Sequence, residues 1–233
     1  MNLHQYIQDI VGLLAPQMCY ACDRPLTSQE QLICLHCLSQ IEQTDFHLCS
    51  SDNELYNRLA GRVPLADAMA LFYFDKAGRM QRLIQALKYQ DAPQLGRVLG
   101  QKYGEILASH PCVEGYDSLV PVPLHPSRKR KRTYNQAEKI AQGLADTLGL
   151  KMRREYLIRS RKTQTQTKLS GSRRWENVSS AFRLKKSLSE NVLLVDDVIT
   201  TGATLEACIR ALMQQDEPPQ KIGVISLGIA RAN

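Results

Sequence analysis

The sequence predicts an α/β fold in which a parallel sheet carries helices on both faces, preceded by a small module built on four cysteines. Apolar runs of strand length alternate with helical patterns from residue 66 onward, and Pro or Gly separates them. Two Cys-x-x-Cys pairs near the N-terminus predict the module. We expect two domains: residues 1–60, with an N-terminal helix, the cysteine module and a linker, and residues 61–233, the α/β domain.

The N-terminal domain is predicted in three parts. Apolar residues at helical spacing predict a helix over residues 1–14, which Pro16 ends. The cysteine module follows to about residue 50, and the polar residues 50–64 are typical of a linker.

The second domain is predicted as alternating strands and helices. In chain order we expect a strand at 66–74, helices at 79–89 and 94–108, a strand at 117–122, a helix at 135–148 that stops at Gly149, a strand near 156–158, a strand at 191–195, a helix at 204–214 and a final strand at 221–228. This alternation favours a parallel sheet.

The composition is that of a water-soluble globular chain, with 43% apolar and 23% charged residues. No apolar run approaches the roughly 20 residues that a membrane helix needs. Residues 1–19 have no Lys or Arg before their short apolar patch, so they do not match a secretory signal. We therefore expect a cytoplasmic location and no membrane insertion.

Four cysteines have the spacing of a metal site: Cys19, Cys22, Cys34 and Cys37. Two Cys-x-x-Cys pairs can hold Zn²⁺ tetrahedrally with four thiolates. A disulfide pair is an alternative that a reducing cytoplasm disfavours, and a thioredoxin-like motif lacks its surrounding βαβ unit. Because protein ligands would fill all four positions, the zinc would be structural and would supply folding energy to the module.

The most informative stretch is residues 192–208, VLLVDDVITTGATLEAC. A buried strand ends in Asp196 and Asp197, and a helix starts at Leu205. The small-residue loop between them contains Thr200, Thr201, Gly202, Ala203 and Thr204. Loop N–H groups and a helix N-terminus attract phosphate, and the acids can accept from ribose hydroxyls or face Mg²⁺. This stretch resembles the PRPP-binding motif of type I phosphoribosyltransferases.

Positive charge is concentrated in one block of the chain. The net charge is +7, but residues 128–186 hold 18 of the 30 basic and only 4 of the 23 acidic residues. Such a block indicates polyanion partners, namely phosphates, pyrophosphate or nucleic acid, with a solvated basic face as the alternative. Three loops, at 121–136, 159–178 and 200–204, follow strands, so we expect them to meet at one pocket.

Nearly the whole chain resembles the ComF family, also called the GntX family. The similarity rests on the four-cysteine module, Ala86-Leu87-Lys88-Tyr89, PVPLHPSRKRKRTYNQA, TQTQTKL with RRWENVSSAF, and VLLVDDVITTGAT. The family pairs a zinc finger with a type I phosphoribosyltransferase-like domain. The resemblance implies a role in natural competence, with single-stranded DNA and a helicase or processing protein of the competence machinery as partners.

The resemblance also implies roles for individual residues. Asp196 and Asp197 would take the ribose hydroxyls of PRPP, bound together with Mg²⁺, and Thr200 to Thr204 would take the 5′-phosphate. Cationic residues would bind the phosphate and pyrophosphate groups: Lys88, Arg128, Arg132, Arg161, Lys162 and Arg174. The chain departs from the family pattern at Thr133 and Lys168, where glycine is usual, which affects loop geometry and not the ligand set.

The resemblance and the charge block together lead to two functional hypotheses. The favoured one is a competence protein that keeps the PRPP pocket and contacts single-stranded DNA, with Tyr134 and Trp175 as candidate base-stacking or packing residues. The alternative is an active phosphoribosyltransferase that transfers the 5-phosphoribosyl group of PRPP to an unknown nitrogen nucleophile. A zinc-bearing adaptor is disfavoured, because an adaptor has no use for the acid pair.

Overall fold

The computed structural model describes residues 16–124, 132–159 and 181–231. The helix expected over residues 1–14 lies outside these ranges. Within them, no helix is both long enough and apolar enough to cross a membrane.

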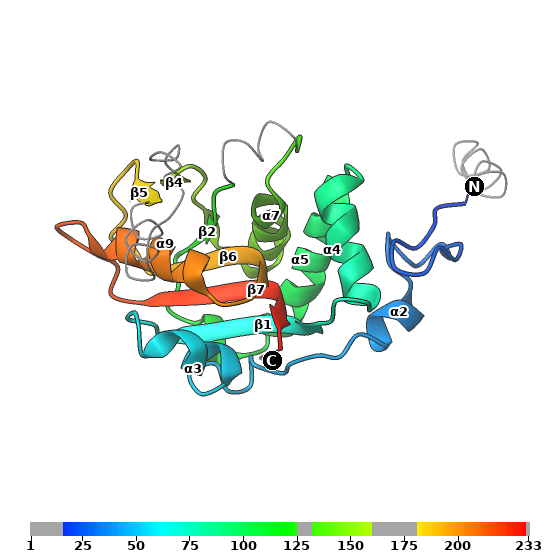
Figure 1. Ribbon diagram of the computed structural model, residues 1–233, viewed down its shortest axis with the longest axis horizontal. Coiled ribbons are helices and arrows are strands. Elements are labelled where there is room, and N and C mark those ends of the chain that lie inside the picture. The colour runs from blue at the N-terminus through cyan, green and yellow to red at the C-terminus, as the bar shows by residue number, and fades with distance from the viewer. Residues whose placement is uncertain (1–15, 125–131, 160–180, 232–233) are drawn as a thin grey trace, which may run out of the picture.

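A five-stranded parallel sheet forms the centre of the α/β domain (Figure 1). Its strands are β1 (Asp67–Phe74), β2 (Ser118–Pro121), β3 (Lys151–Met152), β6 (Val192–Ile199) and β7 (Ile222–Ala230), in the order β1-β7-β6-β2-β3. A separate antiparallel pair joins β4 (Leu157–Arg159) to β5 (Phe182–Leu184). The predicted parallel α/β fold is confirmed.

The strand order places a crevice between β2 and β6. After β2 the chain moves outward to β3, whereas after β6 it moves in the opposite direction to β7. Ligands in open α/β sheets bind where connections diverge in this way, beyond the carboxyl ends of the strands. The acid pair and the loop of residues 200–204 lie at the end of β6 and thus beside this crevice.

Two apolar clusters cover the two faces of the sheet. On one face lie α4 (Arg79–Tyr89), α5 (Pro93–Leu107), α7 (Gln136–Leu148) and the cysteine module with its short α2 (Leu35–Ser39). On the other lie α3 (Glu54–Ala60), α9 (Ala203–Met213) and the β4–β5 pair. Alternate residues of β6 supply the two clusters, with Leu193 and Val195 on the first face and Val192 and Leu194 on the second.

Helices α5 and α7 pack unusually closely because both carry glycines at their contact. A Cβ added at Gly143 would lie 2.0 Å from the carbonyl oxygen of Arg97, and one added at Gly100 would lie 2.2 Å from that of Ile140. The backbones can approach this far only without side chains between them. Helix α7 ends as predicted at Gly149, which has a φ of 70° in the left-handed region.

The structure differs from the sequence-based expectation in three places. Residues 50–64 were expected to form a linker, but they contain α3, which Asn53 caps and which buries Leu55 and Leu59 completely. Strand β6 continues through both acids to Ile199, because β7 pairs with it along that length. The short β3, β5, α2 and the 3₁₀ turn η1 (Pro111–Val113) were not predicted, since so few residues carry no periodicity.

Candidate functional site

The acid pair lies in the last half of β6 and is partly buried. Asp197 forms an ion pair with Lys88, whose Nζ lies 2.9 Å from Oδ2. Each carboxylate also accepts a hydrogen bond from the next backbone N–H: Asp196 from that of Asp197 at 2.9 Å, and Asp197 from that of Val198 at 2.7 Å. The structure therefore brings Lys88, in the last turn of α4, into direct contact with the predicted site.

The two carboxylates differ in their electrostatic surroundings. Burial, and secondarily the neighbouring charge of Asp197, raises the pKa of Asp196 to about 7. The N–H of Asp197 and the positive charges of Lys88 and Arg159 act in the opposite direction. Asp196 therefore holds its negative charge at a cost near neutral pH, which a hydroxyl donor or a cation would reduce.

The loop after β6 turns tightly into α9. Gly202 has a φ of 78° and caps the helix, and a Cβ added there would lie 2.6 Å from Cδ2 of Leu59. The first N–H groups of a helix have no partner within it, so the start of α9 offers donors to an anion. A cavity of about 40 Å³ lies here, lined by Asp196 and residues 198–205.

Two arginines bond the carbonyl groups of this loop, one from within α3 and one just after it. Arg58 donates to the carbonyl oxygen of Thr200, and Arg62 donates to that of Thr201 at 3.2 Å. In a trans peptide the carbonyl and the next N–H point in opposite directions. With both carbonyls facing these arginines, the N–H groups of Thr201 and Gly202 point away from them. Neither arginine was predicted as a site residue.

The carboxylate of Glu206 is also neutralised by arginines. It is buried in the first turn of α9, where it would repel an anion at the helix N-terminus. Arg62 pairs with it at 2.9 Å and Arg210 at 3.0 Å. This arrangement preserves the positive potential of the loop.

The loop after β2 is tied to the end of α4. Tyr134 Oη donates to the carbonyl oxygen of Leu87 at 2.6 Å, and Gln136 Nε2 donates to the same oxygen at 3.1 Å. Arg132 bonds Oε1 of Gln136 at 3.1 Å. The described end of the loop thus lies beside Lys88 and, through it, beside the acid pair.

These contacts bear on the two interpretations of Tyr134. Its hydroxyl is committed to Leu87, and burial raises the pKa of Tyr134 to about 12. These contacts favour the packing interpretation of Tyr134, whose ring also lines a cavity of about 460 Å³. The other predicted residues of these loops, Arg128, Arg161, Lys162, Trp175 and Arg174, lie outside the described residues.

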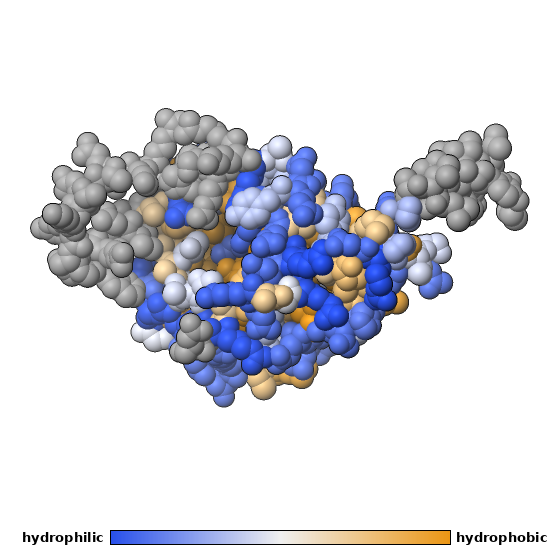
Figure 2. Space-filling model, turned by 45° about the vertical axis from the view of Figure 1, so that its right-hand side comes forward, coloured by the Kyte–Doolittle hydropathy of each residue, from blue (hydrophilic) through white to orange (hydrophobic). Residues whose placement is uncertain are grey.

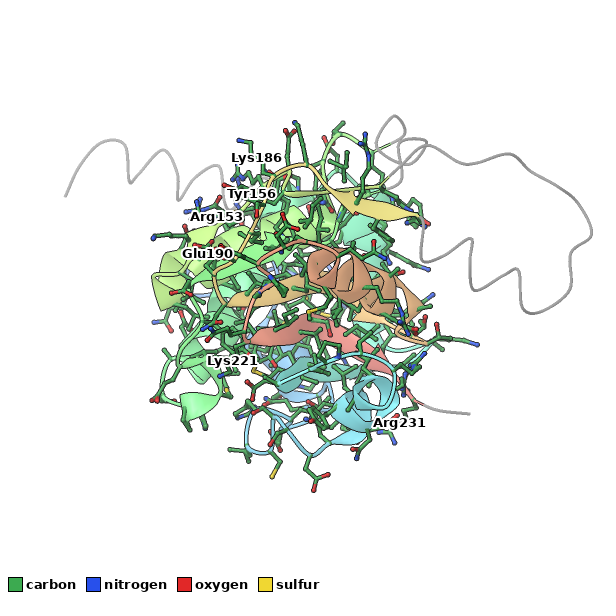
Figure 3. The ribbon with its side chains drawn as sticks, turned by 90° about the vertical axis from the view of Figure 1, so that its left-hand side faces the viewer. Arg153, Tyr156, Lys186, Glu190, Lys221 and Arg231 are labelled. Carbon is green, nitrogen blue, oxygen red and sulfur yellow. The ribbon has the colours of Figure 1, made fainter. Side chains whose placement is uncertain are left out.

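Much of the described part of the basic block is engaged in local contacts, several of which Figure 3 shows. Arg153 and Lys186 both lie over the ring of Tyr156, at 5.6 and 5.7 Å from its centroid. Arg153 also pairs with Glu190 and lowers the pKa of that carboxyl to about 2. These contacts attach the β4–β5 pair to the main sheet.

The four predicted cysteines converge. Their sulfur atoms all lie within 4.8 Å of one another, and the Sγ atoms of Cys22 and Cys34 are 3.8 Å apart. A tetrahedral zinc site with Zn–S bonds of about 2.3 Å would separate its sulfurs by about 3.8 Å. Backbone N–H groups of Ala21 and Cys34 donate to Sγ of Cys19, at 3.4 and 3.3 Å. The cluster can hold a metal ion and is consistent with a zinc finger.

Within the cysteine cluster, the electrostatic surroundings favour the thiolate form of the partly exposed Cys22. Hydrogen bonds from Arg24 lower the pKa of Cys22 to about 6, whereas burial raises the pKa of Cys37 to about 12. A metal ion would favour the thiolate form of all four residues. Cys19 and Cys37 are fully buried in the same apolar cluster as α4, so the module packs on the α/β domain.

Comparison with models of known protein families gives no match. Individual proteins do match: competence protein F of Haemophilus influenzae is 30% identical over 92% of this chain and 96% of its own length. This chain belongs to the ComF family. DNA utilization protein YhgH of Escherichia coli is 28% identical over 87% of the chain and 93% of its own length. Competence protein ComFC of Bacillus subtilis is 25% identical over 91% of the chain and 86% of its own length.

In this ComF-family chain the predicted site residues fall into two groups. The acid pair, the loop of residues 200–204 and Lys88 lie together at the end of β6, and charge from Arg159 reaches Asp196. Arg132 lies in the loop before α7, where it donates a hydrogen bond to Gln136, the first residue of that helix. The edge at the carboxyl ends of the strands, which Figure 2 turns toward the viewer, is mostly hydrophilic with small apolar patches.

Proposed function

We propose that this ComF-family protein acts in natural transformation in the cytoplasm, where it binds PRPP with Mg²⁺ and contacts incoming single-stranded DNA. The supporting relatives are named for competence and DNA utilization. The observation that carries the PRPP part is the acid pair at the end of a central strand, followed by a loop whose peptides Arg58 and Arg62 orient.

The residues present fit a phosphoribosyl ligand chemically. Asp196 and Asp197 accept hydrogen bonds from the two ribose hydroxyls, and Lys88 exchanges its contact with Asp197 for a phosphate oxygen. N–H groups of the loop and of the α9 N-terminus bind the 5′-phosphate. Mg²⁺ bound with PRPP offsets the charge of the pyrophosphate group.

The test of the PRPP site is calorimetric titration of PRPP with Mg²⁺. The double substitution Asp196→Asn with Asp197→Asn should remove most of the affinity without unfolding the protein. The matched control is Asp216→Asn with Glu217→Gln, because these adjacent exposed acids change the charge by the same amount away from the site. Unchanged affinity in the double variant of the acid pair would exclude a PRPP site there.

The DNA part rests on the excess positive charge of residues 128–186. Binding of a labelled oligonucleotide should weaken with salt, with a log–log slope of roughly −3 to −4 if four to six phosphates are neutralised. A slope near −1 would mean that the block serves pyrophosphate alone. Adding PRPP–Mg²⁺ then tells whether the two ligands compete for one surface.

Turnover is a separate alternative that the same acid pair favours. In that reaction a nitrogen nucleophile bonds to the anomeric carbon of PRPP as its bond to pyrophosphate breaks, so pyrophosphate is released. Pyrophosphate release on incubation with DNA or nucleobases would identify a phosphoribosyltransferase.

We further propose that the cysteine cluster holds one structural zinc ion per chain, since its sulfur spacing suits that ion. Metal analysis of the purified protein tests this. Less than half an equivalent in protein whose N-terminal module is folded would contradict it.

A further inference from the structure

One aromatic ring near the candidate site is almost entirely exposed. Tyr89, the last residue of α4, is 74% exposed. A single exposed apolar side chain is common on protein surfaces, so the significance of this ring depends on its surroundings. The preceding residue, Lys88, reaches Asp197 at 2.9 Å, so the ring stands one residue from the candidate phosphoribosyl site.

A guanidinium group lies over this ring. The Cζ of Arg132 is 5.3 Å from the ring centroid of Tyr89, which is a cation–π contact. Arg132 is also bonded to Oε1 of Gln136 at the start of α7, at 3.1 Å. Its neighbours fix the segment in place, because Thr133 bonds to Asp91 and Tyr134 to the carbonyl of Leu87. These contacts hold the guanidinium of Arg132 against the ring of Tyr89.

A second tyrosine offers an informative contrast. The ring of Tyr156 is contacted by both Arg153 and Lys186 and is only partly exposed. Its cations and ring attach the β4–β5 pair to the sheet. Tyr89 has one such contact, with Arg132, and is still 74% exposed, so most of its ring surface remains accessible to a ligand.

We infer that Tyr89 and Arg132 form a stacking platform for one base of a single-stranded DNA segment. This rests on the proposed function, because it names where a base of that DNA binds. Exposed aromatic rings on a positively charged surface bind single strands by stacking, without sequence preference. Arg132 adds a planar cation that can stack or pair with a phosphate.

The adjoining surface suits the neighbouring nucleotide. A cavity of about 460 Å³ begins at Thr133 and Asn135, directly after Arg132, and its lining includes Lys139, Arg154 and Lys185. Phosphates of the strand bind these cations, and the base next to them reaches Tyr89. Ion pairs of Arg154 with Glu138 and of Lys185 with Glu155 moderate the charge, so the ring supplies affinity that charge alone does not.

The test measures binding of a labelled oligothymidylate by fluorescence anisotropy to wild type, Tyr89→Ala and Tyr89→Phe. Loss of one stacked base should weaken binding by about fivefold or more in Tyr89→Ala. Tyr89→Phe keeps the ring and should bind within about twofold of wild type. The salt slope should not change, because stacking releases no counterions. Leu48→Ala, which truncates an exposed apolar residue elsewhere, is the control.

An oligonucleotide with abasic sites decides whether a base is involved. With it, wild type and Tyr89→Ala should bind equally. If wild type binds no DNA, the DNA part of the proposed function and this inference fall together. If wild type binds with a steep salt slope and Tyr89→Ala binds equally well, only the stacking platform is wrong. An equal loss with normal and abasic DNA would likewise overturn it.

Discussion

Replacing Asp196 by asparagine should make the free protein more stable at neutral pH. Burial and the charge of Asp197 raise the pKa of Asp196 to about 7, whereas the pKa of an aspartate in an unfolded chain is about 3.9. The folded state therefore binds the proton more tightly, and the free energy of unfolding falls as the pH rises from about 4 to about 7. A difference of roughly 3 pKa units corresponds to at most about 4 kcal/mol.

Asparagine removes the charge and keeps the shape of the side chain. Its carbonyl oxygen can still accept the hydrogen bond from the N–H of Asp197, which the wild-type carboxylate accepts at 2.9 Å. The stability difference between variant and wild type should therefore be near zero at pH 4, grow through pH 5 and 6, and reach its plateau above pH 7.

Urea unfolding of both proteins from pH 4 to pH 8.5, without divalent cations, measures this difference. Asp197→Asn is the matched control, because it changes the adjacent acid but breaks the 2.9 Å ion pair with Lys88. It should destabilise the protein by about 1–3 kcal/mol. The raised pKa of Asp196 is refuted if Asp196→Asn is no more stable than wild type at pH 8. It is also refuted if the stability difference does not change with pH.

Three further predictions concern the fold, the loop and the cysteine module. Gly143→Ala should lower the free energy of unfolding by about 3 kcal/mol or more, because its Cβ would lie 2.0 Å from a carbonyl oxygen. The control is Gly61→Ala, whose Cβ would meet nothing within 4 Å. Equal urea midpoints of the two variants would contradict this prediction. Arg62→Ala should weaken PRPP–Mg²⁺ binding in calorimetry roughly tenfold by freeing the carbonyl of Thr201, and Arg97→Ala, on a distant ion pair, should not. Cys34→Ser should reduce the metal content below one equivalent and speed amide exchange in residues 16–41, and full metal occupancy would argue against four-cysteine ligation.

The elements that could be predicted from sequence are those with a long, regular pattern. Helix α4 has the predicted bounds, Arg79–Tyr89, and α7 ends at the predicted Gly149. Helix α3 was missed because a seven-residue helix shows barely two turns of periodicity. The glycines that bring α5 and α7 together were also not recognised, since glycine lowers helix propensity and only the partner helix explains its presence.

The chemical centre of the site was predictable, but its support was not. Asp196, Asp197 and the loop of residues 200–204 are contiguous, so one stretch of sequence carries them. Arg58, which bonds the loop carbonyl of Thr200, is 142 residues away in the chain, and no local pattern connects the two. A contact of that kind exists only because α3 packs beside the end of β6.

The different roles of Tyr89 and Tyr134 also depend on contacts that only the fold creates. Tyr89 and Tyr134 both stand near basic residues in the sequence, so charge alone does not separate them. The fold separates them, because the last carbonyls of a helix need donors and Tyr134 Oη supplies one to Leu87. That bond leaves Tyr134 half-buried, whereas Tyr89, two residues farther along α4, remains exposed beneath Arg132. The ring that satisfies the helix end stabilises the fold, and the exposed ring beside it is the one to which we assign base stacking.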